Sequence, residues 1–251
     1  MAELLSGAKA LVTGAGRGIG VEIARLLAAE GASVAVHYRG SRDGAEKTAA
    51  MIRDAGGAAT VVQADLTDET QAGRLVTETI DALGGLDILV NNAAGFGPLK
   101  NLADHTWDEI DGEWRTVVKP VFVLTRAALP HLRAQRRGRI INLSATLLQR
   151  PAQTYGAHGM AKSAVLSFTR TLAREVGPDG ITVNAVSPGM ALTEFSESLP
   201  EELKNAVRDR TPLRRLAAPE DVAKAVLFFA SPLADFVTGA NIAPDGGLAV
   251  L

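Results

Sequence analysis

AKALVTGAGRGIG, residues 8–20, joins a short apolar run to a cluster of glycines. The run at 8–13 has the composition of a buried strand, and an amphipathic helix is expected over residues 19–30, ended by Gly31. Gly14, Gly18 and Gly20 therefore stand between a strand and a helix. Because the amide groups and the positive dipole end of such a helix bind phosphate, this stretch predicts a dinucleotide-binding βα turn.

The same alternation of strand and helix continues along the chain. Strands that alternate with helices form βαβ units on a parallel sheet, and strands that are apolar throughout fit a sheet covered on both faces. We expect one α/β domain over residues 1–251, a doubly wound Rossmann fold with a polar helical lid at 190–210. The expected strands are 8–13, 33–38, 60–64, 87–90, 139–143, 182–186 and 240–243, and the expected helices are 19–30, 43–55, 67–83, 108–135 (bent at Pro120 and Pro130), 154–175 and 220–230.

Composition excludes several classes of function. The 251 residues include no cysteine, so disulfides, a thiolate nucleophile and a cysteine metal site are excluded. The four histidines, at 37, 105, 131 and 158, lack metal-ligand spacing, and we expect no metal. A net charge of −2 argues against nucleic acid or an anionic membrane as partner. The N-terminus lacks signal-peptide features and no apolar run reaches ~18 residues, so we expect a cytoplasmic protein.

The segment after the second expected strand indicates which dinucleotide binds. Dinucleotide folds often place an acidic residue there to hold the ribose hydroxyls. Here the chain reads His37-Tyr38-Arg39, with Arg42 close behind and Arg17 inside the glycine loop. Because a guanidinium binds a 2′-phosphate bidentately whereas a carboxylate repels it, we favour NADPH over NADH. The alternative is that Arg39 and Arg42 are only solvated surface charges.

A second stretch, SATLLQRPAQTYGAHGMAK at 144–162, carries three groups that hold or move protons. Tyr155 precedes His158 by three residues, and His158 precedes Lys162 by four. On a helix, these offsets place all three side chains on one face. Either this stripe carries chemistry, or the spacing is chance and Tyr155 and His158 are packing residues.

Taken together, the motifs resemble those of the short-chain dehydrogenase/reductase superfamily. They are Thr13-Gly14-x-x-x-Gly18-Ile19-Gly20, Asp65, Asn91-Asn92-Ala93, Lys162, Asn184 and Pro188-Gly189. The resemblance covers essentially the whole chain and implies a seven-stranded parallel sheet in a homodimer or homotetramer. It also implies that Asp65 meets the adenine, that Asn92-Ala93 lies along the cofactor and that Thr193 lies near the nicotinamide. With the arginines above, the expected cofactor-binding residues are Gly14, Arg17, Gly18, Ile19, Arg39, Asp65, Leu66, Asn92, Ala93, Lys162, Pro188, Gly189 and Thr193.

The catalytic positions depart from that family. Its members use an Asn–Ser–Tyr–Lys set in which Tyr stands four residues before Lys. Here Lys162 is present, but His158 stands in the Tyr position and Ala145 in the Ser position, with Ser144 adjacent. Val117 stands in the Asn position. The resemblance therefore supports a reductase without supporting the family's usual proton-transfer machinery.

Three functions stay open. Tyr155, seven residues before Lys162, resembles the arrangement in the enoyl-thioester reductases of the superfamily. On that basis we expect an NADPH-dependent oxidoreductase that reduces an activated C=C bond, with the Tyr155 hydroxyl at the substrate oxygen and Lys162 on the cofactor ribose. The first alternative is an atypical carbonyl reductase that uses His158, or the substrate itself, as proton source. Ser144 is then either a relocated substrate-oxygen donor or a strand-end hydroxyl. The second alternative is an NADP(H)-binding sensor or scaffold without turnover.

The substrate pocket is expected to be apolar. Segments 96–106 and 190–210 should form its walls, which favours a small apolar or acyl-thioester substrate. The side chains that suggest this are Phe96, Leu99, Leu147, Leu148, Met190, Leu192 and Phe195.

Overall fold

The computed structural model describes residues 3–249 and contains a seven-stranded, all-parallel sheet. Its strand order is β3-β2-β1-β4-β5-β6-β7, so the chain runs outward from β1 in one direction and from β4 in the other. The doubly wound Rossmann fold is thereby confirmed. The strands are β1 (Lys9–Val12), β2 (Ser33–Tyr38), β3 (Ala59–Gln63), β4 (Ile88–Asn91), β5 (Gly138–Leu143), β6 (Ile181–Val186) and β7 (Asn241–Ile242).

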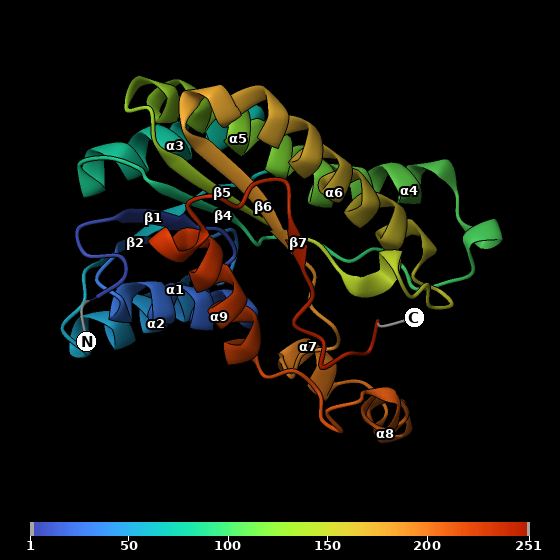
Figure 1. The fold of residues 1–251 in the computed structure, drawn as a ribbon. Helices are drawn as coiled ribbons and strands as arrows, with labels where there is room; N and C mark the ends of the chain where they lie inside the picture. The colour runs from blue at the N-terminus through green and yellow to red at the C-terminus, as the bar shows by residue number, and fades with distance from the viewer. Residues whose placement is uncertain (1–2, 250–251) are drawn as a thin grey trace.

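Helices cover both faces of the sheet (Figure 1). One face carries α1 (Ile19–Ala29), α2 (Arg42–Asp54) and α9 (Pro219–Ala230), and the other carries α3 (Glu69–Leu83), α5 (Lys119–Ala134) and α6 (Gly156–Val176). Each side has its own apolar core, because the strands present aliphatic residues to both faces. Leu11 and Val12, neighbours on β1, belong to opposite cores.

The topology fixes where a ligand can bind. Parallel strands end at the same edge, and the strand order reverses between β1 and β4, where the connections leave toward opposite faces. This switch point is the usual ligand crevice of an open α/β sheet. The glycine loop follows β1. Asn91 is the last residue of β4 and Asn92 follows it, so the loop and these two residues flank the switch point.

Three sequence expectations differ from the structure. The helix expected over 108–135 is divided into α4 (Trp107–Glu113), a π-helical turn (Trp114–Val118) and α5. Pro120 is the second residue of α5 and lies in its first turn, where a proline is tolerated, instead of bending a longer helix. The helix expected over 190–210 is two helices, α7 (Glu194–Glu197) and α8 (Glu201–Arg210), interrupted at Pro200. Tyr155 precedes α6 instead of lying in it.

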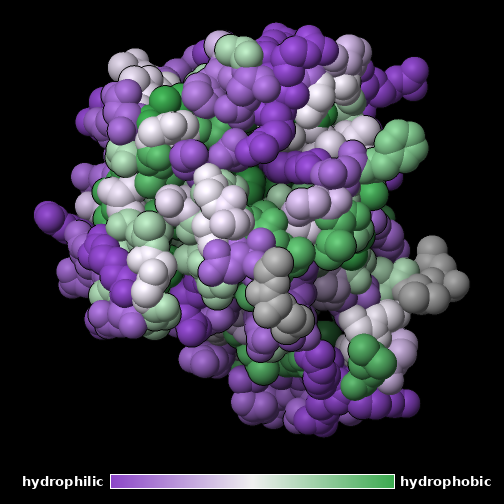
Figure 2. All heavy atoms as spheres, turned by 60° about the vertical axis from the view of Figure 1, so that its left-hand side comes forward, coloured by the Kyte–Doolittle hydropathy of each residue, from purple (hydrophilic) through white to green (hydrophobic). Residues whose placement is uncertain are grey.

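The two helices of segment 190–210 stand apart from the sheet. In Figure 2 the lower part of the molecule, where α8 lies, projects from the body and is mostly hydrophilic. None of the residues of α8 is buried, so this helix contributes no side chain to a hydrophobic core. No helix within residues 3–249 is long and apolar enough to cross a membrane.

Candidate active site

The glycine loop is held by side chains from three other segments. His37 Nδ1 accepts a hydrogen bond from the Gly14 amide at 3.1 Å. The Thr48 hydroxyl donates to the Ala15 carbonyl at 3.0 Å, and Asn92 Nδ2 donates to the Thr13 carbonyl at 2.8 Å. Each contact binds the main chain of the loop, so the loop is fixed before any ligand arrives.

His37 has a defined tautomer. Its Nδ1 accepts from Gly14, so its Nε2 carries the proton that is donated to the Ala64 carbonyl at 3.1 Å. The ring is buried, and burial lowers its pKa to about 4. His37 is therefore a neutral link between the glycine loop and the end of β3, a role that the sequence did not indicate.

The loop fits a pyrophosphate. Gly18 precedes α1 at φ 57°, and no side chain caps the helix, so the first amides of α1 are left for a ligand. A Cβ on Gly20 would lie 2.4 Å from the Gly14 carbonyl oxygen, so the loop needs glycine there. Thr193, at the start of α7, approaches Gly18: its Cγ2 lies 3.6 Å from where a Cβ of Gly18 would be.

The groups expected at the adenosine end lie around the ends of β2 and β3. Arg17, Arg39 and Arg42 are exposed, and no ion pair within residues 3–249 occupies them. Asp65 accepts hydrogen bonds from the Thr67 amide and hydroxyl, which hold its pKa below the usual value. Leu66 is buried in the core beneath.

Lys162 is buried on α6, and its Nζ donates to the Leu143 carbonyl at 2.7 Å. Burial lowers its pKa to about 8, an effect that the negative charge of Glu113 opposes. The Ser144 hydroxyl donates to the Lys162 carbonyl at 3.0 Å. In this structure Ser144 therefore ties β5 to α6, and its expected contact with substrate stays a prediction.

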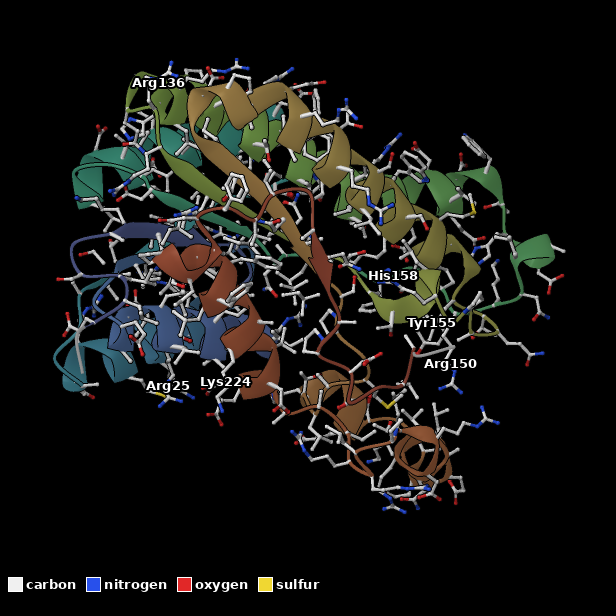
Figure 3. The ribbon with its side chains drawn as sticks, viewed as in Figure 1. Arg25, Arg136, Arg150, Tyr155, His158 and Lys224 are labelled. Atoms are coloured by element: carbon white, nitrogen blue, oxygen red, sulfur yellow. The ribbon has the colours of Figure 1, made fainter. Side chains whose placement is uncertain are left out.

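His158 lies one helical turn before Lys162 and is 4% exposed. Its Nδ1 lies 3.4 Å from Glu113 Oε2, and the Phe96 ring stacks on the imidazole at 4.2 Å between centroids. Within residues 3–249, Nε2 has no hydrogen-bond partner, and it is not among the fully buried unpaired polar atoms. Figure 3 shows His158 and Tyr155 at the N-terminal end of α6.

Glu113 is the residue that the sequence reasoning missed. Its side chain is 3% exposed, and its Oε1 accepts from the Gly97 amide at 2.7 Å. Burial acts to raise its pKa, but hydrogen bonds from His158 and Gly97, with the charges of His158 and Lys162, hold the pKa below its usual value. A signal existed: Glu113 stands one helical turn before Val117, the position of the missing Asn.

Tyr155 is not part of the buried pair. It occupies the residue before α6, is half-buried, and its phenol forms no hydrogen bond within residues 3–249. Burial raises its pKa. Of the expected three-residue stripe, the helix brings together His158 and Lys162, while Tyr155 stands at its edge.

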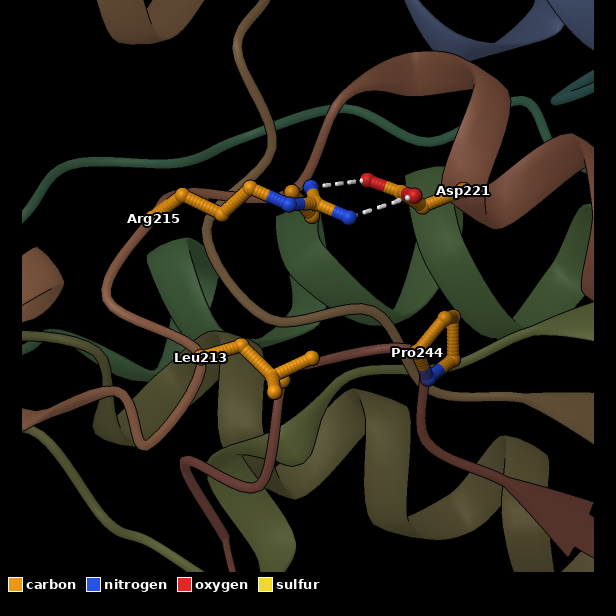
Figure 4. Close-up of a pocket in the computed structure, with 6 residues that line it drawn as sticks. Leu213, Arg215, Asp221 and Pro244 are labelled. Carbon is orange, nitrogen blue, oxygen red and sulfur yellow. Dashed lines mark hydrogen bonds and ion pairs between the residues drawn. The ribbon is translucent and has the colours of Figure 1, made fainter.

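Segment 190–210 is anchored at its base. Ala191 and Ala217 form an isolated parallel bridge, with Leu192 N donating to the Ala217 carbonyl at 2.8 Å. Beside it, Arg215 forms a two-pronged ion pair with Asp221 of α9, in a pocket also lined by Leu213 and Pro244 (Figure 4).

The expected pocket walls are partly open. Phe96, Leu99 and Leu192 are 50%, 43% and 47% exposed. Leu147, Leu148 and Met190 are half-buried, and the side chain of Phe195 lies outside what the structure describes. Exposed apolar side chains around a buried polar corner fit a site that receives an apolar ligand.

Comparison with known proteins places this site in a family. A family model described as enoyl-(acyl carrier protein) reductase matches residues 14–249. The chain is 37% identical over 243 residues to the 3-oxoacyl-[acyl-carrier-protein] reductase FabG of Staphylococcus aureus, covering 95% of this chain and 97% of that protein. It is 38% identical over 252 residues to cis-4-hydroxycyclohexanecarboxylate dehydrogenase of Sinomonas cyclohexanicum, covering 98% of each.

Solved structures agree. A 7α-hydroxysteroid dehydrogenase complexed with NADH and 7-oxo glycochenodeoxycholic acid superposes with a TM-score of 0.94 at 33% identity, covering 98% of this chain and 96% of that one. A short-chain dehydrogenase/reductase from Serratia marcescens gives 0.91 at 35% identity, covering 98% and 100%. The chain matches these reductases and dehydrogenases over nearly its whole length. Together with the fold, the glycine loop and Lys162, these matches show that the chain belongs to the short-chain dehydrogenase/reductase superfamily of oxidoreductases.

Proposed function

We propose that the protein is an NADPH-dependent carbonyl reductase, interconverting a ketone and a secondary alcohol, with His158 as the group that exchanges a proton with the substrate oxygen. One observation carries this proposal: a buried imidazole stands one turn before Lys162, where the family keeps its Tyr, and its Nε2 has no hydrogen-bond partner among the residues that the structure describes. When bound, the reduced nicotinamide supplies the hydride to the carbonyl carbon.

The protein's own residues supply binding and the proton. The glycine loop and the start of α1 would hold the pyrophosphate, and Lys162 the nicotinamide ribose. In reduction, the imidazolium Nε2–H gives its proton to the substrate oxygen; in oxidation, the neutral Nε2 takes a proton from the alcohol. The Nε2–H bond and the Nε2 lone pair lie in the plane of the imidazole, and Phe96 stacks on one face of that ring.

The preference for NADPH rests on charge. Arg39 and Arg42 are exposed at the end of β2, Arg17 lies in the loop, and no carboxylate stands at the end of β2 to repel a 2′-phosphate. The charge of Arg39 acts on Asp65, but none of the three guanidinium groups forms an ion pair within residues 3–249, and each can bind that phosphate bidentately.

The named relatives favour C=O over C=C chemistry. FabG is a 3-oxoacyl reductase, and the cyclohexanecarboxylate and steroid enzymes are dehydrogenases of hydroxyl groups. A C=C reductase that uses Tyr155 is the second candidate, favoured by a half-buried phenol without a hydrogen-bond partner in the described chain. A sensor without turnover has no support from these relatives.

Substrate-dependent oxidation of NADPH tests the proposal. A 3-oxoacyl thioester, a cyclic ketone and a crotonyl-type thioester are compared on the wild type, His158→Ala and Tyr155→Phe. We expect turnover with one or both carbonyl substrates and none with the enoyl thioester. His158→Ala should lower kcat by about 10²–10⁴-fold, the usual contribution of a general acid, with NADPH affinity unchanged.

The opposite pattern would overturn the proposal. Reduction of the enoyl thioester that falls in Tyr155→Phe and persists in His158→Ala would establish the C=C activity instead. Full carbonyl reduction by His158→Ala would show that the proton comes from the substrate or the solvent.

A further inference from the structure

The contact face between α4–α5 and α6 changes character along its length. Glu113 ends α4, Val117 lies in the π-helical turn and Val121 lies in α5, and all three side chains face α6. Val117 and Val121 pack in one apolar cluster with Ala161 and Val165 of α6. Glu113 faces His158 on the same helix, so a buried polar pair adjoins this apolar cluster.

The carboxylate of Glu113 is divided between two partners. Oε1 accepts the Gly97 amide at 2.7 Å, and Oε2 lies 3.4 Å from His158 Nδ1. Gly97 allows this approach, because a Cβ there would lie 3.2 Å from Oε1. An ionised carboxylate is an acceptor only, so the facing Nδ1 has to carry a proton.

We propose that Glu113 is the positioning residue of His158: it fixes the Nδ1–H tautomer, turns Nε2 to the substrate and stabilises the imidazolium. This inference rests on the proposed carbonyl reduction. In that reaction the Nε2–H bond breaks as the new O–H bond of the alcohol forms, and the electron pair of the N–H bond stays on Nε2. The ring is left neutral, its Nδ1–H still on Glu113, until solvent returns a proton to Nε2.

Glu113 also resolves a conflict on α6. Lys162 follows His158 by one turn, and two positive charges at that spacing repel each other. The buried carboxylate of α4 faces the imidazole and also acts on the Lys162 charge. Tyr155, which precedes α6, is a further ionisable group at this end of the helix. One negative charge thus allows the imidazolium and Lys162 to coexist.

Glu113→Gln separates position from charge. The Gly97 amide still requires an acceptor, so the Gln oxygen is held toward Gly97 and the NH₂ group toward His158. The facing Nδ1 then becomes an acceptor, and the neutral ring moves its proton to Nε2. Glu113→Asp keeps the charge, and Asp111→Asn removes an exposed carboxylate of the same helix as the matched control.

Two readouts are used on the full-length protein. ¹⁵N NMR of histidine-labelled protein reports the tautomer without any substrate: we expect Nδ1–H in the wild type and Asp111→Asn, and Nε2–H in Glu113→Gln. In carbonyl reduction, Glu113→Gln should lower kcat by about 10²-fold or more and move the falling limb of the pH profile down by about one unit, because the imidazolium loses its counter-charge. Glu113→Asp should restore part of kcat and the profile.

The outcomes distinguish the two proposals. If His158 keeps Nδ1–H in Glu113→Gln, or if the pH profile does not move, the role of Glu113 is refuted even though the enzyme reduces carbonyls. If the tautomer changes as expected but no carbonyl substrate is turned over by the wild type, the positioning role stands and the proposed reaction fails.

Discussion

The glycine loop and the corner between α4 and α6 are both held by buried polar contacts, but those contacts differ in kind. In the loop, His37, Thr48 and Asn92 all bind main-chain atoms. In the corner, Glu113 binds the side chain of His158, and Phe96 stacks on it. A site defined by backbone keeps its function while its surroundings vary, whereas a site defined by side-chain pairs changes its chemistry with each substitution.

Lys162 lies beside the corner and is the residue proposed to hold the cofactor, and its removal gives the largest expected effect. In Lys162→Met the buried ammonium is lost from the charge environment of Glu113 and from the position proposed to hold the ribose. We expect kcat/KM to fall by about 10³-fold, through loss of a preorganised charge at the reaction centre. Steady-state kinetics measures the effect on turnover, and NADPH titration measures the effect on cofactor affinity. The control is Lys224→Met, which changes an exposed lysine on α9 (Figure 3). A weaker NADPH affinity with unchanged kcat would assign Lys162 to the cofactor region alone.

His37 should make the cofactor region sensitive to acid. Its pKa falls from 6.5 when unfolded to about 4 when buried, so the unfolded chain binds a proton that the folded chain excludes. The free energy of unfolding should decrease by roughly 3 kcal/mol as the pH drops from 6.5 to about 4, and level off below. Urea unfolding across that range measures this. His37→Asn, which keeps an acceptor near the Gly14 amide, should flatten the curve; an equally steep curve would mean that other groups cause it.

Gly20→Ala tests how strictly the loop backbone is defined. The new Cβ would lie 2.4 Å from the Gly14 carbonyl oxygen and 2.7 Å from Asn92 Nδ2. We expect destabilisation of about 1–3 kcal/mol and a weaker NADPH affinity by about 10–100-fold. Thermal unfolding and fluorescence titration are the measurements. Gly73→Ala, on α3 with no atom within 4 Å of its Cβ, should be neutral or stabilising.

Arg39→Ala gives the smallest effect, confined to one ligand. Loss of a charge-assisted contact of about 1.5–3 kcal/mol should weaken NADPH binding about 10–100-fold and leave NADH binding unchanged. Arg25→Ala, an exposed arginine on α1 that pairs with Glu22, is the control. An equal loss of affinity for NADPH and NADH would refute a contact between Arg39 and the 2′-phosphate.

The fold could be predicted from sequence because its signals are local. Each strand is a short apolar run, and the glycine loop lies between one strand and the next helix. The proposed catalytic corner joins residues 96, 113 and 158, which meet where α4 packs against α6, just before the π-helical turn that follows Glu113. No local pattern reports that turn. From the sequence, His37 indicates only that the usual acidic residue is missing. Its structural role depends on Gly14 and Ala64, which follow β1 and β3 and are distant in the chain.

The hydrogen bond from the Gly97 amide to Glu113 has a consequence for how this enzyme can diversify. Segment 94–100 overlaps the predicted wall of the substrate pocket, and its Gly97 amide also binds Glu113, the residue proposed to position His158. An exchange of this segment by evolution or by grafting succeeds only if the incoming loop presents an N–H at the same point and leaves room for the carboxylate. Changes of specificity should therefore arise by single side-chain substitutions around Gly97 and not by insertion or deletion there.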